Sequence, residues 1–272
     1  CYSFMYGIIQ EKGCIIMKGI VIHDFYSGIL CKWKHALIVV FIYIAGCILV
    51  VQSSKNMQDF GNMTFQEIWL GIILGCKPLM SLPIEERTMI PIVWLTLQVY
   101  LTYIIGEYPM KDLEKYGTNL IIRTTKKARW WMSKCIWGMV VTILYYLIGV
   151  ITGIVAMFIT KGKVLGIHEL YDEMCNGYFT QISTLKFVLI AFILPITASM
   201  LMVAIQMMCM TFMKEIVGYV ICVVSMVGAI YYDIPLFYMR NVMATRTVEV
   251  QSISELIIRT VIMCILIFVT MF

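Results

Sequence analysis

The sequence predicts an all-α polytopic membrane protein with six transmembrane helices, an N-terminal interfacial helix and re-entrant external hairpins. Composition is the first observation. Of 272 residues, 61% are hydrophobic and 14% charged, and the mean hydropathy is +0.88. This is far more apolar material than a soluble domain of this size can bury. The second observation is the length of the apolar runs, which suits membrane-spanning helices, whereas a β-barrel would show short segments of alternating polarity.

Polar stretches divide the apolar material into six expected spans. Pro195 predicts a kink in the fourth of them. Gly149 and Gly153, four residues apart in the third, predict the close approach of another helix, which is a packing feature in most proteins. The spans are expected at residues 36–51, 89–106, 135–160, 185–208, 216–231 and 253–271.

The N-terminal region predicts an amphipathic helix. We expect the chain proper to start at Met17, so that residues 1–16 are an extension or disordered and residues 17–272 form a single transmembrane domain. Four apolar residues then recur at intervals of four, with Asp24 off that line, which favours a helix that lies in the membrane interface and leads into the first span. The four are Met17, Val21, Phe25 and Ile29. Two points stay open: whether residues 1–16 are native and whether the C-terminus is truncated.

The longest strongly polar interval between two spans, residues 107–134, sets the predicted orientation. Basic residues collect on the cytoplasmic side of membrane proteins, so this loop and both chain termini are expected to be cytoplasmic. Its seven cations are Lys111, Lys115, Arg123, Lys126, Lys127, Arg129 and Lys134. Residues 65–82 are also apolar, but a crossing there would place the basic loop outside. We therefore expect a re-entrant or interfacial hairpin at 65–82, and a second external apolar segment at 232–252.

The first part of this loop predicts a short helix. Pro109 suits a first helical position, Asp112 suits the positively polarised N-terminal end, and Gly117 suits the C-terminal end. Its apolar face at helical spacing consists of Met110, Leu113 and Tyr116. Two interpretations stay open: a solvated loop that only anchors the topology, or a helix on which a soluble partner docks.

The sequence argues against an enzyme. The three histidines do not pair at metal-ligand spacing, and metalloprotease, nucleophile-elbow and P-loop motifs are absent from it. Any ATP that drives this protein must therefore be hydrolysed by another chain. The ten cysteines form no CxxC pair and are expected to act as small hydrophobes rather than metal ligands. The cations flank apolar segments instead of forming a basic stripe, so no nucleic-acid partner is expected.

Polar residues inside the expected spans mark either helix–helix hydrogen bonds or a substrate path, because an unpaired amide is costly in lipid. We favour the hydrogen bond for Gln206 and leave both interpretations open for Gln98. Gln98 and Ser225 are the candidates for a translocation path.

Several short motifs follow one another along the first half of the chain. They begin with Phe25-Tyr26, Gly28 and Lys32-Trp33, and continue with Ile90-Pro91-x-x-Trp94-Leu95, Tyr108-Pro109, Asp112-Leu113, Gly117, Arg123, Arg129-Trp130-Trp131 and Lys134. Together they resemble the ABC-2 type transporter permeases, the membrane subunits of ATP-binding cassette exporters. The similarity is closest over residues 20–135, and it is carried by the ordered set rather than by any single motif.

The resemblance implies the permease subunit of a bacterial ATP-driven exporter, multi-pass in the plasma membrane. Two permease subunits, identical or different, would pair to form the translocation path. A separate cytoplasmic ATPase would bind ATP and magnesium, so no cofactor is expected in this chain. The alternative is a non-transporting membrane scaffold or sensor that recruits a cytoplasmic partner.

The resemblance also assigns residues and a class of cargo. A coupling helix at residues 109–117 would sit in a groove of the ATPase, and the cargo would be a peptide antibiotic or another amphipathic compound. The coupling residues would be Tyr108, Pro109, Met110, Asp112, Leu113, Tyr116 and Gly117. Arg123, Arg129 and Lys134 would form a cytoplasmic basic anchor.

Overall fold

The computed structural model describes residues 13–55, 62–83, 90–114, 127–168, 182–213, 215–250 and 252–271. Within these ranges all regular structure is helical. Four helical stretches are long and apolar enough to cross a membrane, by length and composition: Gly19–Ser53, Trp130–Ile159, Thr184–Phe212 and Ile253–Met271. These helices are compatible with a membrane protein.

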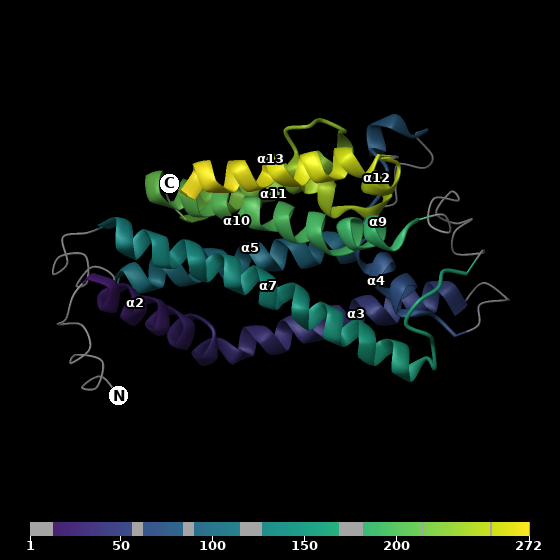
Figure 1. The fold of residues 1–272 in the computed structure, drawn as a ribbon, viewed down its shortest axis with the longest axis horizontal. Helices are drawn as coiled ribbons and strands as arrows, with labels where there is room; N and C mark the ends of the chain where they lie inside the picture. The colour runs from purple at the N-terminus through teal and green to yellow at the C-terminus, as the bar shows by residue number, and fades with distance from the viewer. Residues whose placement is uncertain are drawn as a thin grey trace.

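The long helices run side by side along one axis (Figure 1). Each of the six expected spans overlaps a helix or, for the fourth, a series of consecutive helical elements. The last two have nearly the expected bounds, whereas the second ends at Asp112 instead of residue 106 and the third begins at Lys127 instead of residue 135. In chain order the helices are α2 (Gly13–Gly28), η1 (Leu30–Lys32), α3 (Trp33–Lys55), α4 (Phe65–Ile73), η2 (Leu79–Ser81), α5 (Ile92–Asp112), α7 (Lys127–Ile159), α9 (Thr184–Val188), η5 (Leu189–Ile193), α10 (Leu194–Phe212), α11 (Glu215–Tyr231), η6 (Tyr238–Val242), α12 (Ala244–Val248) and α13 (Ile253–Met271).

Two of the helices that correspond to expected spans, α5 and α11, are not among the four that are long and apolar enough to cross a membrane. α11 is apolar but short, at 17 residues. α5 is long enough, yet it carries polar residues that it buries against other helices, among them Gln98 and Thr102. Length and composition therefore support four spans among the described residues, and the six-span count stays a prediction.

Helix α10 lies at the centre of the bundle. It packs against α5, α7, α11 and α13, so most of its side chains contact other helices. Small residues such as Ala198, Ser199 and Ala204 are fully buried along it, and they let neighbouring backbones approach closely. The two ends of the bundle differ: α2 and the C-terminus lie at one end, and α4, α9 and α12 at the other (Figure 1).

Helix α2 is confirmed as a helix, and its inward face contains a charge. It begins at Gly13, so residues 13–16, which the sequence placed in an extension, belong to it. Phe25 of the predicted apolar line is 46% exposed, whereas Asp24 is only 1% exposed. The expectation that Asp24 would lie on a solvated face is wrong. The face buried against the bundle is Ile20, Asp24 and Gly28.

The irregularity predicted at Pro195 takes the form of one π-helical turn, η5, just before α10. Proline has no N–H, so it cannot donate to the carbonyl four residues earlier, which here is that of Ala191. The indole Nε1 of Trp69 donates to that carbonyl at 2.9 Å. A side chain of α4 thus supplies the hydrogen bond that the proline removes, and it fixes α4 to the middle of the bundle.

Replacing Trp69 by phenylalanine is expected to lower the free energy of unfolding by about 1–3 kcal/mol more than the same change at Trp94. Both indoles are almost completely buried, so the two variants lose similar volume. The Trp94 Nε1, however, has no hydrogen-bond partner among the described residues. Equilibrium unfolding of both variants in mixed micelles measures the difference, and equal losses would contradict this role for Trp69.

Segment 62–83 is the region in which the sequence predicted a re-entrant hairpin. It contains the nine-residue helix α4, about half the length that a membrane span requires. Thr64 and Glu67 form a reciprocal capping box at its start, and Ile68 and Leu70 are fully buried. α4 packs against α3, α5 and α7. A buried short helix is thus established here, while its re-entrant course in a membrane stays a prediction.

The predicted close approach at Gly149 and Gly153 is confirmed. A Cβ atom added to Gly149 would lie 2.4 Å from the ring of Tyr43 in α3. At Gly153 the corresponding distance to the ring of Phe65 in α4 is 3.2 Å. The two glycines therefore form the contact surface of α7 with the helices that precede it in the chain.

Candidate functional site

The end of α5 differs from the predicted arrangement. Pro109 does not begin a separate helix, because α5 continues through it to Asp112. The physical reason is burial: Tyr108 and Asp112, on either side of the proline, are both buried against α2 and α7. These contacts hold the last turn of α5 in place although Pro109 contributes no backbone N–H to it.

A buried ion cluster joins three helices at this end of the bundle. Lys134 of α7 is 0% exposed, and its ammonium group lies between two carboxylates. Its Nζ contacts Asp24 Oδ1 of α2. It lies 2.6 Å from Asp112 Oδ2 of α5. A charge removed from water in this way requires opposite charges and hydrogen bonds around it, and the cluster supplies both.

Neighbouring polar groups satisfy the carboxylates of the ion cluster. Tyr108 donates its hydroxyl to Asp24 Oδ1 at 2.9 Å, and Ser133 donates to Asp24 Oδ2 at 2.5 Å. The indole of Trp130 donates to Asp112 Oδ2 at 3.2 Å. The ring of Tyr108 also lies 4.6 Å from Lys134 Nζ, within reach of a cation–π contact. The network thus includes side chains from α2, α5 and α7.

The ion cluster holds one lysine against two carboxylates, and a histidine borders it. His23 Nδ1 lies 3.7 Å from Asp24 Oδ1 and 3.9 Å from Asp112 Oδ1. His23, Asp24 and Asp112 offer ligand atoms within 4.8 Å of one another, a spacing that could hold a metal ion. The ammonium group of Lys134 already bridges the two carboxylates, and it supplies the positive charge that a metal ion would bring.

A second group of charges lies one turn earlier in α5, beyond the expected span of residues 89–106. The carboxylate of Glu107 is 3.0 Å from Lys32 Nζ, 3.0 Å from His35 Nε2 and 2.6 Å from Lys111 Nζ. Burial raises the pKa of Glu107, but the hydrogen bonds from Lys111 and Lys32 and the charge of Lys32 outweigh it and lower the pKa to about 2. Glu107 therefore stays ionised at neutral pH, and its ion pairs hold η1 and the start of α3 against α5.

The predicted coupling and anchor residues fall into four groups. Tyr108, Pro109 and Asp112 are buried inside the bundle, and Lys134 is a buried cation rather than a solvated one. Met110 and Leu113 are half-buried, and Leu113 packs on the small apolar cluster of Ile20 and Trp130. Arg129 lies in the first turn of α7. Tyr116, Gly117 and Arg123 lie outside the described residues.

The candidate path residues do not meet in one cavity. Gln98 is buried, donates to the Tyr146 hydroxyl at 3.1 Å and accepts from Ser199 at 3.2 Å. Gln206 donates to the carbonyl of Thr102 at 2.9 Å, which confirms the favoured helix–helix hydrogen bond. Ser225 donates to the carbonyl of Ile221 in its own helix and borders a small cavity of about 250 Å³. Gln98 thus belongs to a hydrogen-bond network between α5, α7 and α10.

Asp24 and Ser133 are the members of the ion cluster that sequence reasoning missed. Asp24 is an acid two residues after the apolar run Gly19–Ile22 and directly before Phe25, and that context was the available signal. Lys134 and Asp112 were singled out, but Asp112 was assigned to the coupling helix and Lys134 to a cytoplasmic basic anchor, not to a buried ion pair. Comparison with family models, curated proteins and solved structures found no match to this chain.

Proposed function

We propose that this chain is the permease subunit of an ATP-driven exporter, and that the ion cluster couples its helices to a separate ATPase. The proposal combines the resemblance of the ordered motifs with the position of the cluster. Two such subunits would enclose a path for an amphipathic cargo in the plasma membrane. This chain would then contribute the path and the coupling surface, and the partner ATPase would contribute the bound ATP and magnesium.

The observation that carries the proposal is the connection of the end of α5 to the start of α7, at the segment 109–117 that the resemblance assigns to coupling. Asp112, close to the end of α5, is bonded through Lys134 near the start of α7 to Asp24 of α2. Trp131 of α7 also donates to the carbonyl of Met271 at the end of α13, at 3.1 Å. Helices α2, α5, α7 and α13 are thus connected where α5 ends and α7 begins, at the segment that would bind the partner.

Such a connection suits the transmission of force. Separating a buried ion pair costs about 3–5 kcal/mol, because it leaves an uncompensated charge in an apolar environment. A push on residues 109–117 would therefore move the ends of α5 and α7 together with α2, instead of bending one helix alone.

The test co-expresses the full chain with a candidate ATP-binding cassette ATPase and measures ATP hydrolysis by the purified complex in lipid vesicles. The variant exchanges Lys111→Glu and Glu114→Lys, two exposed residues at the end of α5. It keeps the net charge but reverses the charge pattern, and charges at an interface rim set orientation and association. We expect the amount of bound ATPase to fall about fivefold, roughly the effect of 1 kcal/mol.

The matched control is Lys163→Glu, an exposed charge reversal beyond the far end of α7. It should leave ATPase binding unchanged. If no ATPase co-purifies with the wild-type chain, the proposal fails. If an ATPase binds but neither hydrolyses ATP faster nor drives movement of an amphipathic peptide, the scaffold or sensor interpretation replaces it.

A further inference from the structure

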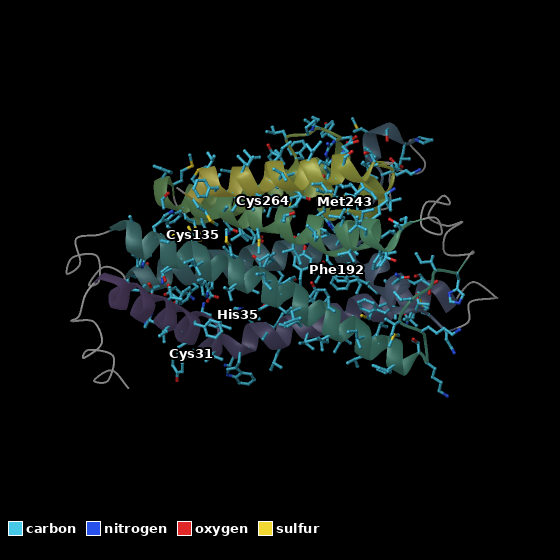
Figure 2. All side chains as sticks on the ribbon, in the orientation of Figure 1. Cys31, His35, Cys135, Phe192, Met243 and Cys264 are labelled. Carbon is cyan, nitrogen blue, oxygen red and sulfur yellow. The ribbon has the colours of Figure 1, made fainter. Side chains whose placement is uncertain are left out.

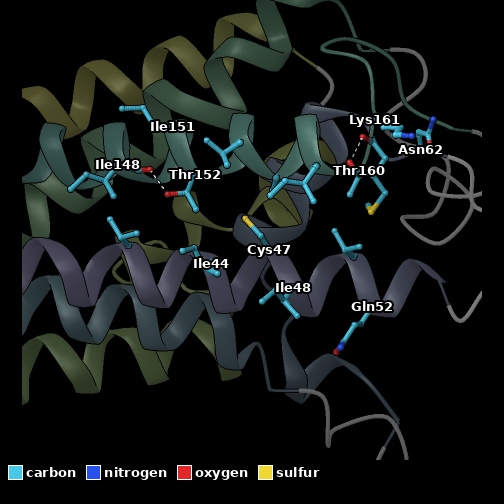
Figure 3. A pocket seen from close by; sticks show the side chains of 16 residues that line it. Ile44, Cys47, Ile48, Gln52, Asn62, Ile148, Ile151, Thr152, Thr160 and Lys161 are labelled. Atoms are coloured by element: carbon cyan, nitrogen blue, oxygen red, sulfur yellow. Dashed lines mark hydrogen bonds between the residues drawn. The ribbon is translucent and has the colours of Figure 1, made fainter.

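A groove runs between α3 and α7 on the outside of the bundle. Its cavity volume is about 1060 Å³. Figure 3 shows Ile44 and Ile48 of α3 facing Ile148, Ile151 and other side chains of α7 across it. Ile44, Ile48 and Ile151 are exposed, so the groove is open along its side. Its volume and apolar walls suit an acyl chain.

One end of the groove is polar. Four polar side chains, those of Gln52, Asn62, Thr160 and Lys161, border the groove near the ends of α3 and α7 (Figure 3). The groove therefore has an apolar trough and a polar mouth. A lipid molecule is divided in the same way, into apolar acyl chains and a polar headgroup.

Lys161 is the charge at this mouth, and its backbone is held in a defined position. It has φ +56°, the left-handed conformation that often ends a helix. Its N–H bonds to the carbonyl of Phe158 at 3.2 Å, and the N–H of Gly162 bonds to that of Met157 at 3.0 Å. Among the described residues no acidic side chain pairs with Lys161. Within the described part of the chain, the mouth therefore presents a positive charge that no acidic side chain pairs with, at the end of α7.

We propose that this groove binds an anionic phospholipid, with one acyl chain between α3 and α7 and the phosphate against Lys161. Charge complementarity selects this occupant. The phosphate of an anionic lipid would pair with the ammonium group of Lys161, whereas a neutral lipid would leave that positive charge without an opposite charge. The site lies on α3 and α7, away from the ion cluster, and the inference is independent of the proposed function.

Native mass spectrometry of the full chain in detergent tests the proposal, with dioleoyl phosphatidylglycerol and dioleoyl phosphatidylcholine as probes. The wild-type chain should retain phosphatidylglycerol at least about fivefold better, as expected for one cation near an anionic headgroup. Lys161→Gln should remove this preference. Lys163→Gln, an exposed lysine two residues away that does not line the groove, should keep it.

A second variant tests the trough itself. Ala156 lines the groove, so Ala156→Trp should fill it and reduce retention of both lipids, while Leu49→Trp, an exposed residue outside the groove, should not. Unchanged helical content by circular dichroism shows that each variant is folded. Equal retention of the two lipids by the wild-type chain, or equal effects of the two lysine variants, would overturn the proposal. A dimer that Ala156→Trp dissociates would assign the groove to a second copy instead.

Discussion

Replacing Lys134 by methionine is expected to lower the free energy of unfolding by about 3–5 kcal/mol, since this change leaves two buried carboxylates without their cation. Asp24 and Asp112 would then repel each other, with only neutral donors and His23 beside them. Equilibrium unfolding of the purified chain by titration with SDS in mixed micelles measures the loss.

Lys111→Met is the matched control for this prediction. Lys111 lies on the same end of α5 and pairs with Glu107 at 2.6 Å, but its side chain is 63% exposed. Exposed pairs contribute at most about 1 kcal/mol. A triple variant with Asp24→Asn, Asp112→Asn and Lys134→Met should recover much of the lost stability, because it removes the unpaired charges. Equal losses for Lys134→Met and Lys111→Met would show that the ion cluster is not a stabilising element.

Replacing Arg246 by methionine is expected to lower the free energy of unfolding by about 3 kcal/mol, because it leaves one buried and two partly buried carbonyls without their donor. The guanidinium of Arg246 donates to the carbonyls of Ile230 and Tyr232, both at 3.1 Å, and to that of Cys76 at 3.0 Å. It thus binds the end of α11 to the segment that follows α4. The same SDS titration measures the effect.

Arg240→Met is the corresponding control, since Arg240 lies in the neighbouring helix η6 and donates to the exposed carboxylate of Asp233 at 2.8 Å. Its loss should cost no more than about 1 kcal/mol. If both arginine variants unfold at the same SDS concentration, the three carbonyl contacts of Arg246 do not hold this end of the bundle together.

The helices could be predicted from the sequence because each depends on a local property, a run of apolar residues bounded by polar ones. Residues 216–231 and 253–271 were expected to span the membrane and are helices with nearly those bounds. Pro195 likewise acts locally: it removes one backbone donor, and the helix is irregular beside it. How the π turn and Trp69 accommodate it depends on another helix, which the local sequence does not contain.

The ion cluster could not be predicted because its members are spread over 110 residues and meet only in three dimensions. The polarity pattern along α2 predicts that a polar residue is exposed to solvent. Asp24 is an exception because Lys134 and Tyr108 on the facing helices bind its carboxylate. The helix boundary at Pro109 could not be predicted for the same reason. Proline is common at the first position of a helix, which favoured a new helix there. Buried contacts of Tyr108 and Asp112 keep that turn within α5 instead.

Site-specific photo-crosslinking in living cells tests most directly whether an ATPase docks beside the ion cluster, as we propose. A photoreactive amino acid at position 114, exposed at the end of α5, should form an adduct with an ATP-binding cassette ATPase, identified by mass spectrometry of its P-loop peptide. The same group at position 164, exposed beyond the opposite end of α7, should not. Capture at 164, or at neither position, would contradict the account.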